Sequence, residues 1–273
     1  MIVEMPVMCA SNVEVFTGMS EIYDRARPSM PDKLLSVVKR YLGREVRCVV
    51  DVGCGTGKSL DMWLDQAQHI IGVEPNAELR AVAEKKYADR PEVCFFDDCG
   101  EKMSIPDNTA DVITCVQVFH WLDDKQALPE FDRILKPGGM LLVCDFDFPP
   151  ISLWEADRAY AELLQFQKEM DKKYPELNRD VFEGDKLLNL QKIAGSGYFD
   201  YCRNAGFIAD ELFDAKRYID LAFSQSTLDR IARAKLPEAE EPIGRFKSAV
   251  CRAFGGKEYE IQFCMRMTLA VKK

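Results

Sequence analysis

The chain has 273 residues, of which 47% are hydrophobic and 30% charged, which is enough for one large globular domain and argues against disorder. Its formal net charge of -9 would repel a phosphate backbone, so we expect no nucleic-acid partner. No apolar run approaches the roughly 20 residues of a membrane span, and the first residues lack the pattern of a signal peptide, so we expect a cytoplasmic protein with no membrane partner.

Short β-rich runs alternate with helical patterns through the first half of the chain. Residues 31–42 place apolar side chains on one helical face, and Asn76 can cap the helix that follows it. Five runs have the composition of strands that are buried on both faces: 46–52, 69–73, 93–96, 111–116 and 139–144. This order of strand, helix and strand predicts a doubly wound, mostly parallel α/β sheet.

The alternation stops after residue 148. The stretch 149–206 is polar and mostly helical in pattern, and we interpret it as a helical lid inserted over the sheet. Residues 207–213 and the period-two pattern near the C-terminus predict two further strands, which would complete a seven-stranded sheet at one edge. The predicted organisation is an N-terminal helical arm and cap (1–45), a core (46–148), the lid (149–206) and a C-terminal part that completes the sheet and its cover (207–273).

A glycine-rich loop follows the first predicted strand. A phosphate-binding loop of the type G-x-x-x-x-G-K-[ST] would need a glycine where Val52 stands. The dinucleotide fingerprint G-x-G-x-x-G would need one where Lys58 stands. The pattern that remains is D-x-G-x-G-x-G, in which Asp51 precedes three glycines, Gly53, Gly55 and Gly57.

The acid that opens this pattern favours a cationic ligand. The Asp51 carboxylate would repel a pyrophosphate, whereas it would stabilise a ligand that carries an ammonium and a sulfonium group. S-adenosylmethionine is such a ligand, and glycines let the backbone approach it closely. Glu74 ends the second strand, where it can accept hydrogen bonds from both ribose hydroxyls, although this position would serve NAD equally well.

Four consecutive motifs within about residues 46–145 resemble those of the class I S-adenosylmethionine-dependent methyltransferases. They are DVGCGTGKS, GVEPN, CGEKMSIPDNTADVITCVQVFHW and EFDRILKPGGMLLV. The stretch FTGMSEIYDRARPSMP and the run QVFHW also resemble the trans-aconitate methyltransferase branch. The resemblance implies a Rossmann-like sheet, S-adenosylmethionine as cofactor and S-adenosylhomocysteine as product.

The resemblance also implies which residues bind the cofactor. The adenine would lie near Cys99, Gly100 and Glu101, and the methionyl end near Gln117 and Tyr23. In the first two motifs, contacts are expected from Asp51, Gly53, Cys54, Gly55, Gly57, Glu74 and Pro75. The chain departs from the family at Ser104, where proline is usual, and in the run DDC at 97–99, where an acid and an alanine are typical, and the second departure leaves the adenine contact open.

Methyl transfer mainly requires that the acceptor atom is held in line with the sulfonium methyl group. A carboxylate acceptor needs no base, whereas a hydroxyl, phenol or thiol would be helped by one, for which His120 is the candidate. The alternative is that His120 and Trp121 form a packed wall of the pocket. Arg27 can bind an acidic acceptor through a bidentate contact, although a solvated arginine is the commoner case. Together with the resemblance of the arm, Arg27 favours O-methylation of a small molecule, on a carboxylate before a hydroxyl, with Arg27 and Trp121 near the acceptor.

Two other functions fit parts of the sequence. One is a binding module that keeps the cofactor loop without catalysis, and the other is an NAD-dependent oxidoreductase, against which Asp51 and Lys58 argue. We expect no metal, because the chain has only two histidines and none of its ten cysteines forms a C-x-x-C pair. Neither the identity of the acceptor nor the oligomeric state follows from the sequence.

Overall fold

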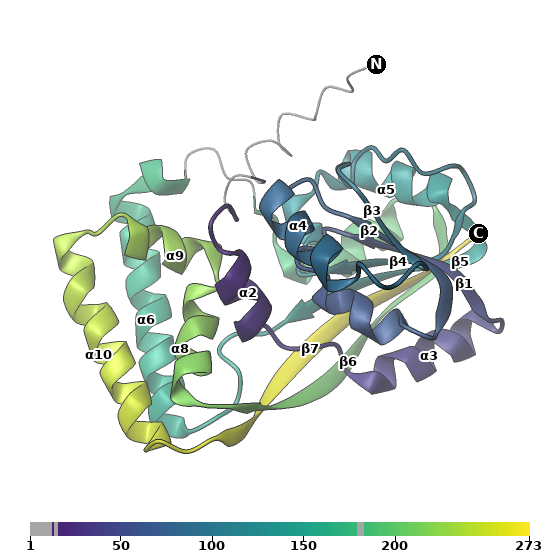
Figure 1. Ribbon diagram of the computed structural model, residues 1–273. Helices are drawn as coiled ribbons and strands as arrows, with labels where there is room; N and C mark the ends of the chain where they lie inside the picture. Colours follow the sequence, from purple (N-terminus) through teal and green to yellow (C-terminus); the bar gives the residue numbers. More distant parts are fainter. Residues whose placement is uncertain (1–12, 14–15, 179–182) are drawn as a thin grey trace.

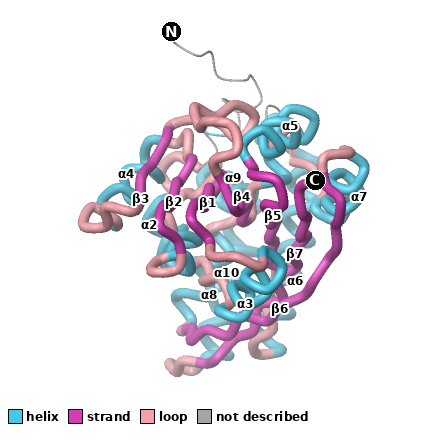
Figure 2. Tube along the Cα trace, turned by 90° about the vertical axis from the view of Figure 1, so that its right-hand side faces the viewer, coloured by secondary structure: helices cyan, strands magenta, loops and turns pink. Residues whose placement is uncertain are grey.

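A seven-stranded mixed sheet forms the centre of the protein. The structure, a computed structural model, describes residues 13, 16–178 and 183–273 (Figure 1). The strands are β1 (Val46–Val52), β2 (Ala67–Val73), β3 (Val93–Phe96), β4 (Ala110–Val116), β5 (Leu135–Phe146), β6 (Phe199–Phe213) and β7 (Tyr259–Lys272). Their order in the sheet is β3-β2-β1-β4-β5-β7-β6, which can be followed from left to right in Figure 2.

The first five strands are parallel, and β7 runs antiparallel to both β5 and β6. The predicted doubly wound, mostly parallel sheet is therefore confirmed. Burial explains why the strand sequences are so apolar, since six of the seven residues in β1 are buried. The strand order changes direction between β1 and β4, and in open α/β sheets ligands bind at the carboxyl ends of the strands beside such a point.

Helices cover both faces of the sheet and form a separate group beyond one end of it (Figure 1). Around the sheet lie α3 (Asp32–Leu42), α4 (Ala77–Lys86), α5 (Asp124–Ile134) and α7 (Asn189–Gly195). The helix α2 (Ser20–Ala26) lies between these and the separate group (Figure 1). The separate group, which we call the cap helices, consists of α6 (Trp154–Lys173), α8 (Ala215–Phe223), α9 (Ser226–Arg233) and α10 (Pro237–Phe254). Short 3-10 helices are η1 (Lys58–Trp63), η2 (Phe119–Trp121), η3 (Pro175–Asn178) and η4 (Lys186–Leu188).

Local sequence signals agree with the helix starts and packed faces. In α3, Leu34, Val38 and Leu42 are buried in the core on one side of the sheet. The side chain of Asn76 accepts the backbone N–H groups of the first turn of α4, as the sequence predicts. Helices α5 and α7 bury apolar residues in a second core on the opposite side, so the core domain has three layers.

Strands β6 and β7 join the sheet to the cap helices. Only the C-terminal half of β7 pairs with β5, while β6 and β7 pair with each other along their whole length. They therefore continue beyond β5 as a two-stranded ribbon against which the cap helices lie (Figure 1). β6 begins at Phe199, inside the predicted lid stretch 149–206. The sequence does not predict this part of the strand, because its polar and small residues hide the strand pattern.

Within the described residues, no helix combines the length and the apolar character that crossing a membrane requires. The same part of the chain contains no cluster of three or more His, Cys, Asp or Glu side chains arranged to bind a metal ion.

Candidate active site

The glycine-rich loop leaves β1 and turns sharply before η1. Gly53 and Gly55 have left-handed backbones, with φ angles of 64° and 57°, which side chains other than hydrogen disfavour. A Cβ atom on Gly53 would also lie 2.3 Å from Cγ2 of Val118, in the segment after β4. Both the backbone conformation and the packing therefore require glycine at position 53.

Glu74, at the end of β2, holds this loop in place. Its Oε2 accepts the backbone N–H of Gly55 at 2.9 Å, and its Oε1 accepts that of Asn76 at 2.8 Å. The side chain is only 7% exposed, and burial raises its pKa to about 7. Because each carboxylate oxygen can accept a second hydrogen bond, Glu74 can fix the loop and still bind a hydroxyl of a ligand.

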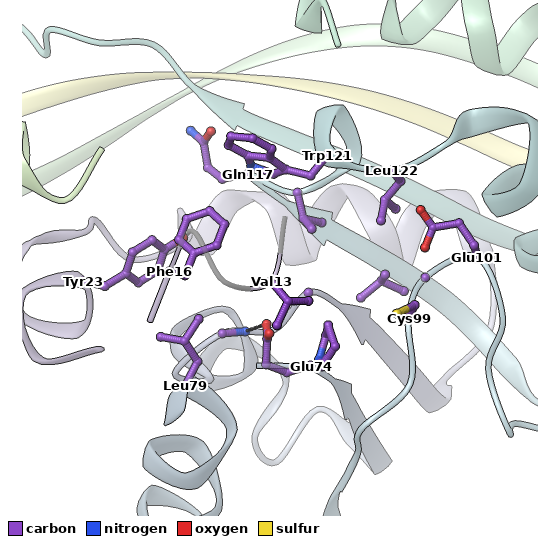
Figure 3. A pocket seen from close by; sticks show the side chains of 16 residues that line it. Val13, Phe16, Tyr23, Glu74, Leu79, Cys99, Glu101, Gln117, Trp121 and Leu122 are labelled. Atoms are coloured by element: carbon purple, nitrogen blue, oxygen red, sulfur yellow. Dashed lines mark hydrogen bonds between the residues drawn. The ribbon is translucent and has the colours of Figure 1, made fainter. Parts of the chain in front are cut away.

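A pocket lies above the loop, with Glu101 and Tyr23 on opposite sides and Trp121 over it (Figure 3). It encloses about 670 Å³ of empty space, including the part open to solvent. The lining residues that the sequence predicted are Tyr23, Gly53, Gly55, Glu74, Pro75, Cys99, Gly100, Glu101, Gln117 and Trp121. We call this space the loop pocket.

Asp51, Cys54 and Gly57 do not line the loop pocket. Asp51 is fully buried, and its carboxylate accepts hydrogen bonds from the hydroxyls of Ser59 and Thr114. Burial raises the pKa of Asp51 to about 6. Cys54 lines a smaller neighbouring hollow, and Gly57 packs against the end of α4. The expected direct contact between the Asp51 carboxylate and a cationic ligand is therefore not available, because that side chain lies beneath the loop.

A second, more polar hollow adjoins the loop pocket, and we call it the polar hollow. The two spaces share four lining residues, Phe16, Tyr23, Gln117 and Trp121. The polar hollow is also lined by Arg27, Phe148, and the predicted candidate His120, together with polar residues of α6, α9 and the segment 183–186. Two molecules bound in these spaces would therefore meet at the shared wall.

Gln117 fixes the boundary between the two spaces. Its backbone is left-handed, with φ at 58°, although it is not glycine, and such strain tends to gather at functional sites. Its Nε2 donates to the carbonyl of Phe146 at 3.0 Å, and its Oε1 accepts from Nζ of Lys186 at 2.8 Å. Both ends of the amide are thus held, and the orientation of the side chain is set.

Arg27 presents a preorganised cation at the edge of the polar hollow. Its guanidinium lies 4.8 Å from the ring centroid of Tyr23 and 5.1 Å from that of Phe148. Nη2 donates to the carbonyl of Ser224 at 2.8 Å, while Nε is buried without a partner. Since none of its contacts in the described part of the chain is a carboxylate, Arg27 can bind an anionic group.

His120 lies in η2 at the inner wall of the polar hollow and is 3% exposed. Its Nδ1 is 3.6 Å from Oδ1 of Asp145, and its Nε2 is 3.9 Å from Oε1 of Glu183. Burial lowers the pKa of His120 well below its ordinary value, and the charges of Lys186 and Arg27 lower it further. The imidazole is therefore neutral at neutral pH and able to accept a proton.

Comparison with known families adds a decisive observation. Residues 50–143 match a family model described as a methyltransferase domain. The matched segment runs from β1 through β5 and contains the glycine loop, Glu74, Glu101 and Gln117. This chain carries a class I, S-adenosylmethionine-dependent methyltransferase domain. The narrower resemblance to the trans-aconitate branch stays a prediction.

Relatives of this methyltransferase domain include bacterial and fungal proteins. An uncharacterized methyltransferase of Mycobacterium tuberculosis is 32% identical over 119 residues, which cover 44% of this chain and 46% of the relative. One from Schizosaccharomyces pombe is 34% identical over 125 residues, which cover 44% of this chain and 47% of the relative. The chain spans about half the length of the curated relatives it matches.

Solved structures share the methyltransferase fold. A structure from Anaeromyxobacter dehalogenans, described as a candidate type II methyltransferase, has a TM-score of 0.64 and 16% identity over 90% of this chain and 97% of that chain. Another is phosphoethanolamine N-methyltransferase 2 of Haemonchus contortus, solved with phosphomonomethylethanolamine and S-adenosylhomocysteine. It has a TM-score of 0.52 and 15% identity, and the match covers 95% of this chain and 56% of that chain. At these identities the likeness shows the fold alone.

Sequence reasoning missed several residues that line the two spaces. Phe16 contacts Tyr23 and Trp121 edge-on, with ring centroids 6.3 and 5.7 Å away, and it lies in the arm motif, so a signal was present. Lys186 and Gln225 come from segments without a motif, far along the chain. Only the three-dimensional fold brings these two side chains to the site.

Proposed function

We propose that the protein transfers the methyl group of S-adenosylmethionine to an oxygen atom, of a carboxylate or a hydroxyl, in a small molecule. The observation that carries this proposal is the shared wall between the loop pocket and the polar hollow. In-line displacement requires the methyl carbon and the acceptor atom about 3 to 3.5 Å apart. Two adjoining spaces of this kind can hold the two substrates in that relation.

The residues of the loop pocket fit S-adenosylmethionine. Oε1 of Glu101 accepts the backbone N–H of Asp123 at 3.0 Å, but its Oε2 is buried without a partner. The exocyclic amine of an adenine beside Cys99 and Gly100 would satisfy this oxygen. Glu74 would accept from the ribose, and the methionyl end would lie toward Gln117 and the arm. When it is bound, S-adenosylmethionine supplies an activated methyl group on its sulfonium sulfur.

The polar hollow fits a small acceptor with an anionic group. Arg27 would bind this group, and Trp121 would form an apolar wall beside it. His120 faces the same hollow, and it is the candidate base if the methylated atom is a hydroxyl oxygen. Burial of the acceptor here would also exclude water from the reacting atoms.

We further propose that the segment 149–206 acts as a lid that selects the acceptor. Three residues of the polar hollow come from it, namely Gln167, Glu183 and Lys186. The arm and cap (1–45), the S-adenosylmethionine-binding core (46–148) and the C-terminal part (207–273) supply the remaining walls of the two spaces. The expected partner is a small molecule in the cytoplasm.

A nicotinamide oxidoreductase is a weaker alternative for this site. The pyrophosphate of NAD would lie on the glycine loop, close to the buried carboxylate of Asp51, and like charges would repel it. A binding module without catalysis is the other alternative. It would retain the loop pocket but would not move a methyl group to any acceptor.

The test is methyl transfer itself. The protein is incubated with S-adenosylmethionine and a library of small carboxylic and hydroxy acids, and mass spectrometry measures S-adenosylhomocysteine and methylated product. We expect acceptor-dependent product, and a decrease of roughly 10- to 100-fold in kcat/KM for Arg27→Ala, since a hydrogen bond to a charged group is lost. Arg25→Ala is the control, because Arg25 is exposed and pairs with Asp220. Binding of the cofactor without product for any acceptor would favour the binding module.

A further inference from the structure

Three polar atoms lie buried without a hydrogen-bond partner on His120, which lines the polar hollow, and on two residues behind it. They are Nδ1 of His120, Oδ1 of Asp145 and Oδ1 of Asn189, and each of these side chains is 3% exposed. Buried polar atoms normally have partners, so a group of three requires an explanation such as a catalytic role. The residues come from η2, the end of β5 and the start of α7, which are distant in sequence.

Asn189 determines which oxygen of Asp145 faces His120. Its Nδ2 donates to Oδ2 of Asp145 at 3.0 Å. The other oxygen, Oδ1, then lies 3.6 Å from Nδ1 of His120. A decrease of about 0.7 Å would give a normal hydrogen bond and satisfy both atoms. In proteins without bound ligand, catalytic hydrogen bonds are often long in this way and shorten when substrate binds.

We propose that Asp145 is a positioning residue for His120, whose Nδ1–H it accepts, so that Nε2 is the base that takes a proton from a hydroxyl group of the acceptor. The base role of His120 rests on the proposed methyl transfer, and it narrows the substrate class from oxygen acceptors in general to hydroxyl compounds. With Arg27 at the edge of the same hollow, the class becomes hydroxy acids, with the carboxylate as anchor and the hydroxyl as the methylated group.

The step is balanced in atoms and charge. The O–H bond of the acceptor breaks, and its proton moves to Nε2 of His120. The oxygen forms a bond to the methyl carbon, the carbon–sulfur bond breaks, and its electron pair stays on sulfur. The sulfonium thus becomes the neutral thioether S-adenosylhomocysteine, the acceptor becomes a methyl ether, and the positive charge is now on the imidazolium, next to the Asp145 carboxylate.

The charges around His120 suit this role. Asp145 faces it from β5 and Glu183 from the segment before η4, while Lys186 and Arg27 are the cations on the other sides. Nζ of Lys186 is also 3.9 Å from Oδ1 of Asp145. Burial and, to a smaller extent, the two cations lower the pKa of His120 and keep the resting ring neutral, and the carboxylate stabilises the ring once it is protonated. Asp145 would then act only through His120, without contact to the substrate.

The tautomer of His120 tests the proposal without any acceptor. The chain has two histidines, and the other, His69, is exposed, so His69→Gln leaves a single imidazole for long-range proton–nitrogen NMR. We expect this ring to be protonated on Nδ1 at neutral pH. In Asp145→Asn the carbonyl oxygen should face the amide of Asn189, so the new NH2 donates to Nδ1 and moves the ring proton to Nε2.

Asp147→Asn is the matched control, because Asp147 is two residues away and pairs with Arg266 instead. It should keep the Nδ1–H form. The same tautomer in the Asp145→Asn variant as in the wild type, or an Nε2–H form in the wild type, would overturn the proposal. If Asp145→Asn does not fold, Asp145→Ala and Asn189→Ala provide the same readout, since either removes the partner or its orientation.

Turnover gives a second readout with a hydroxy acid found in the methyl-transfer assay. We expect Asp145→Asn to lower kcat roughly 100-fold with little change in KM, and the product to be a methyl ether. A methyl ester as the only product would refute the hydroxyl assignment. Calorimetry with S-adenosylhomocysteine should be unchanged in Asp145→Asn. Failure of the wild type to bind it would instead refute the proposed function and leave the tautomer result standing.

Discussion

Asp51 acts on the active site from beneath the loop. Its carboxylate accepts hydrogen bonds from the hydroxyls of Ser59 in η1 and Thr114 in β4. Asp51 therefore links the end of β1 to the helix that follows it and to the neighbouring strand. This is a structural contribution to the site, since the loop that follows Asp51 forms the floor of the loop pocket. Its negative charge also raises the pKa of Glu74, in addition to the larger effect of burial.

Burial of Asp51 predicts a pH dependence of stability with a definite sign. Its pKa is about 6 in the folded protein and roughly 3.9 when unfolded. Between these values the folded state binds more protons than the unfolded state, so stability falls as pH rises, and it levels off above the folded pKa. The Asp51→Asn variant does not lose stability in this way, because asparagine does not ionise.

We therefore compare the free energy of unfolding of the Asp51→Asn variant with that of the wild type. The variant should gain stability relative to the wild type, by on the order of 2–3 kcal/mol, between about pH 4 and about pH 7. Urea unfolding at several pH values in this window measures the difference, in which the titrations of Glu74 and Asp145 largely cancel. A difference that does not change with pH would show that Asp51 titrates alike in both states.

Single residues differ in how far the sequence predicts them. Motif positions assign Glu74, Glu101 and Gln117 to the cofactor site, and all three line the loop pocket. Asp51 belongs to the same motif as the glycine loop, but its side chain points beneath the loop. A strand end has two sides, and the motif alone does not tell which one a side chain faces. The partnership of His120 with Asp145 is equally invisible, because nothing in the sequence links β5 to η2.

At the scale of elements, the loop between β1 and η1 determines the cofactor site. It is held on three sides, by Glu74 from β2, by Val118 after β4 and by the turn into η1. Gly53 stands at the tightest contact. Loss of glycine here would displace the loop from Val118 as well as strain the backbone.

Gly53→Ala should therefore lower the affinity for S-adenosylhomocysteine by at least roughly tenfold, an effect of about 1.4 kcal/mol. Gly138→Ala is the matched control, because Gly138 has a φ of 69° but no atom within 4 Å of the position that a Cβ would occupy. It carries the same backbone strain, about 1–2 kcal/mol, without a clash. Calorimetry should show near-normal affinity for this variant, and equal affinity for both would mean that the contact with Val118 is unimportant.

The strands of the core could be predicted because each is a short apolar run between turn signals. β1 and β3 have the predicted bounds, and β5 is longer than predicted because the KPGG turn residues extend the strand at its start. The sequence predicts β6 only from residue 207, since the first half of this strand is exposed and polar at the edge of the sheet. The hydrophobic pattern by which a strand is predicted depends on burial of its side chains, and the side chains of an edge strand are less buried.

The whole molecule combines a core that binds one ligand with a cap that shapes a second space. The ribbon of β6 and β7 extends from the sheet into the cap helices, so both parts have a common support (Figure 1). Buried aromatic rings pack the cap, with Tyr160 5.7 Å from Tyr218 and 5.5 Å from Phe246. The sequence predicts helices over the sheet, but the composition of the polar hollow requires the fold, because its residues come from six separated stretches of the chain.

The glycine loop of this domain is expected to bind a sulfonium nucleoside and not a phosphate-bearing dinucleotide, and the proposed chemistry depends on this choice. Isothermal titration calorimetry of the wild-type protein with S-adenosylhomocysteine and, separately, with NAD tests it most directly. We predict binding of S-adenosylhomocysteine in the micromolar range or tighter and no measurable heat with NAD. Binding of NAD together with no binding of S-adenosylhomocysteine would contradict the account.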